Sequence, residues 1–452
     1  MLTDLHLQPI ADLAPLLRYR QVSSVEVTEA CLEQIAARNH ELNAFITVLA
    51  DRARIDARAA DAELARGDCR GPLHGIPVSL KDLIDVAGVA TTAASRLRES
   101  HVAPADAVVV SRLRDAGAVI VGKCNLHEFA FGTTCEDSAW GPVRNPIDPR
   151  RSPGGSSGGS AVAVTTGMSA MSVGTDTGGS IRIPAAACGC VGLKPTAGEI
   201  PTDGVVPLSR SLDHVGPLAR SVGDAWIAYH ALAGTPAVEP LHDRDRRDTA
   251  GIRIGLLRRY FAELLDDEVR LAFDAELQRM QQAGVAIEEV TVPHAADIAA
   301  VYMHIQLPEA SAYHASALET RAGDYTTSVR LRLEMGRYVL AEDFVRAQRG
   351  REVLAAEVDR ALEGRDALVL PTLPIPAPAL GATSVTVGHH NEPVRALMLR
   401  QTQLFDLTGH PAITLPCLRT AGGLPCGWQI VGHRHRTADL LRLAFSLEAA
   451  SL

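Results

Sequence analysis

Two glycine- and serine-rich stretches and three isolated lysines are the parts of this sequence whose residue types suggest chemistry. The first stretch, SPGGSSGGSAVAV, spans residues 152–164, and the second, GTDTGGSIRIPAA, spans residues 174–186. Among 44 basic residues only Lys81, Lys123 and Lys194 are lysines. Since a guanidinium stays protonated in proteins, each lysine is a candidate for a role that requires losing a proton, and packing alone is the alternative for each.

The first stretch has three possible interpretations: a phosphate loop, a nucleophile loop or a flexible linker. A phosphate loop needs either a lysine at its end or a strand before its glycines. Ser160 stands after Gly159 where the lysine would be, and the polar, proline-containing run NPIDPRRSP before the loop cannot be a buried strand. Residues 154–158 match the GxSxG pattern of a nucleophile elbow, yet the buried strand that must precede such a serine is missing. A linker conflicts with the apolar segment AVAVTTGMSAMSVG, which follows at once and is typical of a protein core.

The second stretch fits a serine nucleophile better, because it follows a strand-like run. Ser180 begins a short helix-like segment in which Pro184 falls in the first turn, where a missing N–H costs least. Gly178 and Gly179 allow the backbone to approach a ligand closely. The amides at the start of this segment would face a developing oxyanion, so Ser180 is the candidate nucleophile.

A serine nucleophile needs a base, and neither stretch contains a histidine. Lys81 lies in HGIPVSLKDLIDV, framed by apolar residues. On an extended strand Ser79 and Lys81 share one face and Asp82 lies on the other, so Asp82 is not the expected partner of Lys81. Burial can lower a lysine pKa by several units from about 10.4, toward the range of a neutral base near pH 7.

Short apolar runs alternate with helical patterns through most of the chain. Helices are predicted over residues 23–39, which begin with the capping-box pair Ser23 and Glu26, and over residues 52–67. Strands are predicted in GIPVSLKDLIDVAG, AVIVGKCN and SAMSVGTD, with helices in DAVVVSRLRDAG and SGGSAVAVTTG between them. The alternation predicts an α/β fold with a large sheet covered by helices on both faces.

The polar stretch of residues 234–251 is the clearest boundary or insertion in the chain. Strand patterns resume after it in GIRIGLL and AGVAIEEVTVP, residues 310–365 are mostly helical in pattern, and DALVLPTLPIPAPALG begins as a strand. We therefore expect one domain over residues 1–452. Its expected parts are a helical segment (1–67), a core (68–232), a more variable substrate-side region (233–380) and a C-terminal return to the core (381–452).

Composition excludes several classes of function. The formal net charge of −9, without a basic block, argues against binding to nucleic acid or to an anionic membrane surface. The first residues do not match a secretory signal, and no run of about 20 apolar residues could span a bilayer. Eight scattered cysteines form no CxxC pair or metal-like spacing, so a reducing cytoplasm is the expected compartment. His127 and Glu128 lack a second histidine at helical spacing, so no metal is expected there.

Taken together, these motifs resemble the amidase signature family, which includes bacterial amidases and the A subunit of glutamyl-tRNA amidotransferase. The resemblance rests on GPLHGIPVSLKDLIDVAG, GAVIVGKCNLHEFAFG, WGPVRNPIDPRRSPGGSSGGSAVAV and GTDTGGSIRIPAAACGCVGLKPT. It resumes at LVLPTLPIPAP and DLTGHPAITLPCLRTAGGLPCGWQIVG. The implied fold is a large, twisted, mixed central sheet with helices on both faces.

The resemblance also implies roles for particular residues. Ser180 would attack the substrate, Ser156 would relay the proton and Lys81 would accept it, with Ser156 preferred to Ser157 because it lies 24 residues before Ser180. A non-proline cis peptide bond is implied before Ser156. The remaining implied residues are the oxyanion-hole amides of Thr177, Gly178, Gly179 and Ser180, a structural ion pair of Asp176 with Arg182, and an acyl pocket lined by Phe131, Gly132, Thr133 and Thr134.

Two functions compete on this scaffold. One is a stand-alone amidohydrolase acting on a small amide, ureide or carbamate without a cofactor, and a homodimer is the expected assembly. The other is the glutaminase subunit of a tRNA-dependent amidotransferase, which would need partner chains. Such subunits usually carry an Arg-Tyr-Asp-Gly type segment, where this chain has LPEASAYHASALETRAGDYTTSVRLRLEMG. That departure favours the hydrolase.

Overall fold

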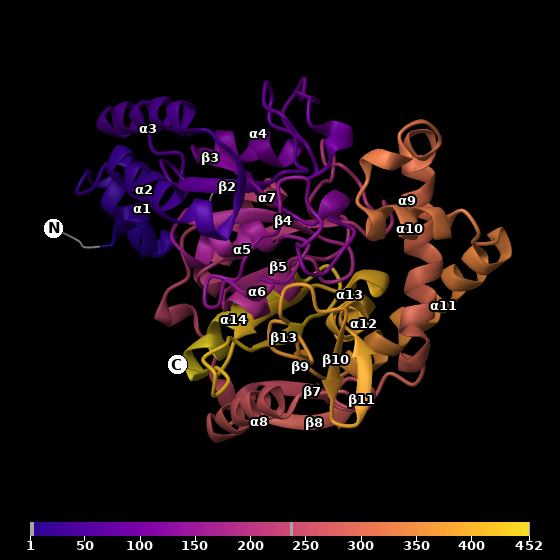
Figure 1. Cartoon of the computed structure of the whole chain (residues 1–452). Coiled ribbons are helices and arrows are strands. Elements are labelled where there is room, and N and C mark those ends of the chain that lie inside the picture. The colour runs from indigo at the N-terminus through magenta and orange to yellow at the C-terminus, as the bar shows by residue number, and fades with distance from the viewer. Residues whose placement is uncertain (1–3, 236–237, 452) are drawn as a thin grey trace.

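One mixed sheet organises the chain, as the computed structural model shows for residues 4–235 and 238–451 (Figure 1). Among the described residues the sheet has 11 strands. In spatial order they are β1 (Phe45–Val48), β3 (Val119–Cys124), β2 (Pro77–Lys81), β4 (Met171–Asp176), β6 (His214–Ala219), β5 (Val191–Lys194), β12 (Ala412–Pro416), β13 (Gly427–Val431), β9 (Ala367–Pro371), β7 (Arg253–Leu257) and β8 (Ala286–Val290).

Parallel and antiparallel pairs occupy different parts of this sheet. β2 lies between β3 and β4 and is parallel to both, and β7 lies between β8 and β9 with the same parallel relation. The strands from β4 through β9 in the centre are joined by antiparallel pairs. β7 and β8 therefore continue the same sheet beyond the polar stretch of residues 234–251, of which residues 236–237 lie outside the described part of the chain.

Helices cover both faces of the sheet, which confirms the predicted fold class. Along β3, Val119 and Val121 pack with α5, α2 and α3, whereas Ile120 packs with α4 and α7 on the opposite face. The helices outside the later helical lobe are α1 (Ile10–Arg18), α2 (Ser24–Leu42), α3 (Ala50–Ala65), α4 (Val108–Asp115), α5 (Gly158–Thr165), α6 (Arg182–Cys188), α7 (Val222–Ala233), α8 (Asp267–Gln282), α12 (Val394–Leu399), α13 (Gln403–Thr408) and α14 (Thr437–Ser451).

The local signals read from the sequence act as expected. The Ser23 side chain accepts a hydrogen bond from the Glu26 amide and the Glu26 carboxylate accepts one from the Ser23 amide, so the capping box starts α2. α3 ends two residues before Gly67, whose φ of 89° is strained for other residues. The predicted strands before residue 180 correspond to β2, β3 and β4.

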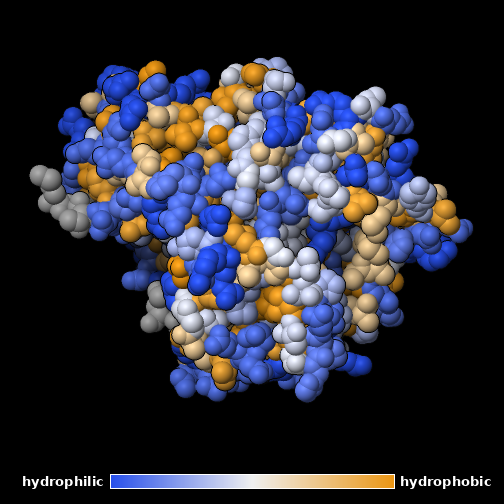
Figure 2. Space-filling view, in the orientation of Figure 1, coloured by the Kyte–Doolittle hydropathy of each residue, from blue (hydrophilic) through white to orange (hydrophobic). Residues whose placement is uncertain are grey.

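Three helices form a separate lobe at the right of Figure 1: α9 (Ile298–Thr320), α10 (Thr327–Gly336) and α11 (Ala341–Leu362). This confirms the helical pattern predicted for residues 310–365. Many of the exposed large apolar side chains of the molecule belong to this lobe, among them Met303, Met335 and Tyr338. Figure 2 shows hydrophobic residues on the side of the molecule that these helices occupy.

Smaller elements complete the chain. β10 (Ser384–Val387) and β11 (His390–Pro393) form a separate antiparallel hairpin that leads into α12. Short 3-10 turns lie at Leu5–Leu7, Arg96–Arg98, Glu128–Ala130, Asp243–Asp245, Thr249–Gly251, Ala295–Asp297 and Ala322–Asp324. Within the described ranges, no helix is both long and apolar enough to cross a membrane.

Candidate active site

Lys81 is the last residue of β2, a strand that is buried along its whole length between two parallel neighbours. Its Nζ lies 2.7 Å from Ser156 Oγ and 2.8 Å from Thr175 Oγ1, and the side chain is fully buried. Burial lowers the pKa of Lys81 from 10.5 to about 7. No carboxylate of the described residues forms an ion pair with this amine, so a neutral amine able to accept a proton is populated near neutral pH.

The other two lysines have different surroundings. Lys123 Nζ lies 2.9 Å from Asp82 Oδ1, so Asp82 pairs with Lys123 and points away from Lys81, as strand alternation predicts. Lys194, at the end of β5, donates to the carbonyl of Pro195 at 2.9 Å. Burial also lowers the pKa of Lys194 to about 7, so a lowered pKa does not by itself distinguish Lys81.

The glycine-serine stretch before α5 brings one of its serines to Lys81. A cis peptide bond joins Gly155 to Ser156, as the family resemblance implies. The Ser156 hydroxyl faces Lys81, whereas the Ser157 hydroxyl donates to the carbonyl of Thr175 at 3.1 Å. The Ser157 amide donates to the carbonyl of Ser180 at 3.1 Å and ties this stretch to the second one. The structure thus separates the two adjacent serines by their partners.

Ser180 lies in the turn between β4 and α6. The Asp176 carboxylate accepts the amides of Gly179 at 2.5 Å and Ile181 at 3.1 Å, and these bonds fold the turn around it. Gly179 has a φ of 135°, which only glycine adopts readily. Ser180 is 7% exposed, and its hydroxyl has no hydrogen-bond partner among the described residues. The hydroxyl is therefore free to meet a substrate.

The amides of this turn divide into two groups. Those of Thr177, Gly178 and Ser180 donate to no acceptor in the part of the chain that the structure describes. The Gly179 amide, which the resemblance places in the oxyanion hole, instead donates to Asp176. The geometry accordingly leaves Thr177, Gly178 and Ser180 as the amides available to an oxyanion, and gives Gly179 a role in shaping the turn.

Asp176 and Arg182 form the ion pair that the resemblance implies. The guanidinium binds the carboxylate through two contacts of 3.0 Å, and it also lies 2.6 Å from Asp406 Oδ2. Burial raises the pKa of Asp176, but the Arg182 charge and hydrogen bonds outweigh it, so the pKa lies below its usual value. Burial raises the pKa of Asp406 well above its usual value, and the Asp176 charge raises it further. One carboxylate therefore stays ionised against Arg182, consistent with a supporting role.

The segment Phe131–Thr134 lies beside the Ser156 stretch. A Cβ atom on Gly155 would lie 3.0 Å from the backbone of Thr133 and of Thr134, so the two segments are in contact. Phe131 is fully buried, and Gly132 packs against the His127 ring so closely that a Cβ would overlap it. Of the predicted pocket residues, Thr133 and Thr134 are thus next to the stretch that holds Ser156.

Several neighbours of the site could not be identified from the sequence. Thr175 contacts Lys81, and Asp406 contacts Arg182 from a point 224 residues further along the chain. A Cβ atom on Gly178 would lie 2.5 Å from the Tyr302 hydroxyl and 3.2 Å from Leu399. Thr175 belongs to the second glycine-serine stretch, but only the register of β4 with β2 brings it to Lys81. No sequence motif pointed to Tyr302 or Leu399 as neighbours of the site.

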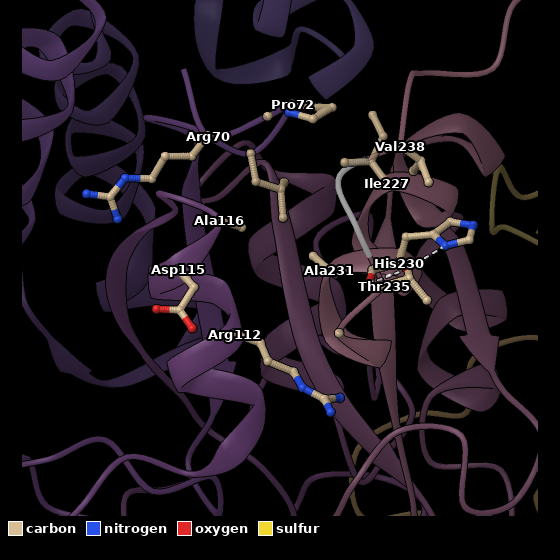
Figure 3. Close-up of a pocket in the computed structure, with 13 residues that line it drawn as sticks. Arg70, Pro72, Arg112, Asp115, Ala116, Ile227, His230, Ala231, Thr235 and Val238 are labelled. Carbon is tan, nitrogen blue, oxygen red and sulfur yellow. Dashed lines mark hydrogen bonds between the residues drawn. The ribbon is translucent and has the colours of Figure 1, made fainter. Parts of the chain in front are cut away.

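Two other features lie apart from these residues. His127 Nε2 lies 3.2 Å from Asp137, and no group of three or more His, Cys, Asp or Glu residues in the described ranges could hold a metal. A surface pocket of ≈ 330 Å³ lies between α4 and α7 (Figure 3). Arg112, Asp115 and His230 line it, and none of the predicted site residues does. This pocket is therefore separate from the predicted site residues.

Comparison with known proteins gives one consistent result. The family model described as Amidase matches residues 26–441. An amidase of Pseudomonas putida is 42% identical over 92% of this chain and 90% of its own length. The A subunit of the glutamyl-tRNA(Gln) amidotransferase of Koribacter versatilis is 37% identical over 95% of this chain and 96% of its own length. A crystal structure of an amidase superposes with a TM-score of 0.92 at 38% identity, over 98% of this chain and 100% of that one.

Proposed function

The chain belongs to the Amidase family, the amidase signature enzymes, and from this premise we propose that it is a stand-alone amidohydrolase that forms an acyl-enzyme at Ser180. The family makes it a hydrolase that acts on carbon–nitrogen bonds other than peptide bonds. The proposal adds the mechanism, in which Lys81 is the base and Ser156 the proton relay, and the substrate, a small molecule with an amide, ureide or carbamate bond.

The contact between Lys81 Nζ and Ser156 Oγ at 2.7 Å is the observation that carries this proposal. A buried amine with a pKa of about 7 lies against a serine hydroxyl, and among the described residues no carboxylate forms an ion pair with it. A general base works best when its pKa is close to the working pH, and Lys81 meets that condition. Neither glycine-serine stretch offers a histidine that could replace it.

Acylation follows from these positions. Neutral Lys81 accepts the proton of the Ser156 hydroxyl while Ser156 Oγ accepts that of Ser180, and Ser180 Oγ bonds to the substrate carbonyl carbon. The amides of Thr177, Gly178 and Ser180 stabilise the tetrahedral oxyanion. The hydroxyls of Ser156 and Ser180 share no hydrogen bond here, and such catalytic contacts commonly tighten only when substrate is bound.

Collapse of the tetrahedral adduct breaks the carbon–nitrogen bond. Ser156 gives its proton to the departing nitrogen, and the proton held by Lys81 returns to Ser156, so the relay is restored with Lys81 neutral. A water molecule then loses a proton to the same relay as its oxygen attacks the acyl carbon. Release of the acid regenerates the Ser180 hydroxyl, and the net reaction is hydrolysis.

A second function, the glutaminase subunit of a tRNA-dependent amidotransferase, is supported by relatives that carry that name along nearly their whole length. Residues 307–336 differ from the segment usual in such subunits, which supports the hydrolase. The turnover of amides other than glutamine by the chain alone separates the two functions.

The test uses the purified chain beside Ser180→Ala. Both proteins are incubated with primary amides, anilides, ureides, carbamates and glutamine, and released ammonia or amine is measured. We expect turnover of non-glutamine substrates and a loss in Ser180→Ala on the order of 10⁶-fold, the cost of removing a serine nucleophile in comparable enzymes. Near-normal rates in Ser180→Ala would contradict the mechanism, and cleavage of glutamine alone would favour the amidotransferase function.

A further inference from the structure

Two arginines converge on the ring of Phe131, beside the proposed acyl pocket. The guanidinium carbon of Arg332, on α10, lies 5.3 Å from the ring centroid, and that of Arg395, on α12, lies 5.5 Å from it. The two side chains thus come from different elements and meet at one residue. Neither side chain is freely exposed.

No carboxylate in the described part of the chain forms an ion pair with either arginine. Arg395 forms no hydrogen bond or ion pair with any residue that the structure describes, and the side chain of Arg332 donates only to the carbonyl of Phe131. Asp137 acts on Arg332 at longer range, but its carboxylate accepts a hydrogen bond from the Ser328 hydroxyl and lies 3.2 Å from His127 Nε2. Burial, together with the charge of Arg395, lowers the pKa of Arg332 to about 10.

α12 carries both Arg395 and a residue that contacts the turn holding Ser180. Leu399 follows Arg395 by four residues, so the two side chains share one face of the helix. Leu399 reaches the turn that holds Ser180, because a Cβ atom on Gly178 would lie 3.2 Å from it. The charge of Arg395 also acts on Tyr302, whose hydroxyl lies beside the same glycine. The guanidinium therefore interacts with both Phe131 and Tyr302, and Tyr302 lies against the turn that holds Ser180.

Structural needs alone do not account for this arrangement. Cation–π contact with one ring stabilises a guanidinium modestly, whereas two like charges removed partly from water repel each other. A bound carboxylate would neutralise the pair and accept two parallel hydrogen bonds from an arginine fork. Because Leu399 of the same helix and Tyr302 contact the turn that holds Ser180, the substrate is the natural source of that carboxylate.

We propose that Arg332 and Arg395 bind a carboxylate of the substrate, so that this enzyme acts on anionic amides. The inference rests on the proposed function and names its substrate class. Among the compounds left open by the sequence, it selects those in which a short linker joins the scissile amide, ureide or carbamate to a carboxylate.

The test compares amides that differ only in charge. Malonamate is paired with isovaleramide and succinamate with isocaproamide, so that an isopropyl group replaces the carboxylate. We expect wild-type kcat/KM to favour the anionic member by roughly 10- to 100-fold, the usual effect of a charged hydrogen bond. Arg395→Gln should reduce that ratio by a similar factor, and Arg395→Lys should restore part of it.

Arg330→Gln is the matched control, because Arg330 lies on the same helix as Arg332 and pairs on the surface with Glu334 at 3.5 Å. It should leave the anionic-to-neutral ratio unchanged. A merely structural loss in Arg395→Gln would lower kcat/KM for both members equally, and a thermal melt checks folding. Arg395 is preferred to Arg332 for this test, because Arg332 also supports the Phe131 carbonyl.

Binding provides a readout that needs no turnover. Succinate is titrated by calorimetry into Ser180→Ala with and without Arg395→Gln, and we expect binding only with Arg395 intact. One outcome is turnover that depends on Ser180, with an anionic-to-neutral ratio of kcat/KM near one that does not change in Arg395→Gln. It would overturn the inference and leave the proposed function standing. Amide release that survives in Ser180→Ala would overturn the proposed function, while Arg395-dependent succinate binding would still support the anion site. Absence of both anionic turnover and succinate binding would overturn the inference.

Discussion

Lys81 and Lys194 are two fully buried lysines of one sheet whose hydrogen-bond partners differ. Burial lowers the pKa of each to about 7. Lys81 faces two hydroxyls, one of them on Ser156, whereas Lys194 donates to the backbone carbonyl of Pro195. Charged groups around Asp406 and Arg182 act on Lys194, and no reactive hydroxyl of the described residues contacts it.

The comparison separates two requirements of a catalytic base. Burial supplies a neutral amine, but the amine must also touch a group whose proton it can take. Lys123 differs from both of those lysines, because its amine forms an ion pair with Asp82, whose Oδ1 lies 2.9 Å away. Of the three buried lysines, therefore, only Lys81 contacts a serine hydroxyl.

Removal of each amine should have very different effects on turnover. Lys81→Met should lower kcat/KM roughly 10³- to 10⁴-fold, because general-base assistance is lost. Lys194→Met is the matched control, because burial lowers the pKa of both lysines to about 7. Its loss of kcat/KM should be at least about tenfold smaller than that of Lys81→Met, since Lys194 does not begin the proton relay. Steady-state assays on folded variants measure both. Equal losses would show that the contact with Ser156 is not what distinguishes Lys81.

The partner hydroxyl can be tested with adjacent serines. Ser156→Ala should lower kcat/KM roughly 10²- to 10³-fold, since the link between Lys81 and Ser180 is broken. Ser157→Ala removes the neighbouring hydroxyl, which bonds the carbonyl of Thr175, and should cost less. Values of kcat/KM for the two variants on one substrate show which serine relays the proton. A greater loss in Ser157→Ala would reassign the relay.

The pH dependence of activity should report the Lys81 amine. Its pKa of about 7 means that the fraction of neutral amine rises about tenfold per unit below pH 7 and levels off above it. We therefore expect kcat/KM to increase from pH 6 toward pH 8 and then flatten. A profile that is flat from pH 6 to pH 9 would contradict Lys81 as the base.

The smallest expected effect is on the pH dependence of stability, and it should be the same for Lys81→Met and Lys194→Met. Between about pH 7 and 10.5 each lysine is protonated in the unfolded chain and neutral in the folded protein, because burial lowers its pKa. The free energy of unfolding therefore rises with pH across this window. Below about pH 7 both states are protonated and the dependence ends. Each Lys→Met variant should lose this slope, roughly 1.4 kcal/mol per pH unit for one proton. Denaturant unfolding at pH 7 and pH 9 measures it, and an unchanged slope would contradict the lowered pKa.

Local chemistry made much of the fold predictable. The capping box of Ser23 and Glu26, the glycine that follows α3 and the alternation that separates Lys81 from Asp82 all act through neighbours in sequence. The two glycine-serine stretches were also visible, because their residue types suit tight turns and close backbone approach. Which serine faces Lys81 came from a family resemblance, and the structure gives the contact itself.

The sequence by itself determined the kinds of groups available, the strands and helices that carry them and the face on which Lys81 lies, since these depend on short-range periodicity. Tertiary structure decided which distant groups meet: Thr175 at Lys81, Asp406 at Arg182, and Arg332 with Arg395 at Phe131. It also gave the Gly179 amide to Asp176 rather than to an oxyanion. Alternation along a strand fixes a face but not a neighbour, because the neighbour depends on sheet register and helix packing, which join segments hundreds of residues apart.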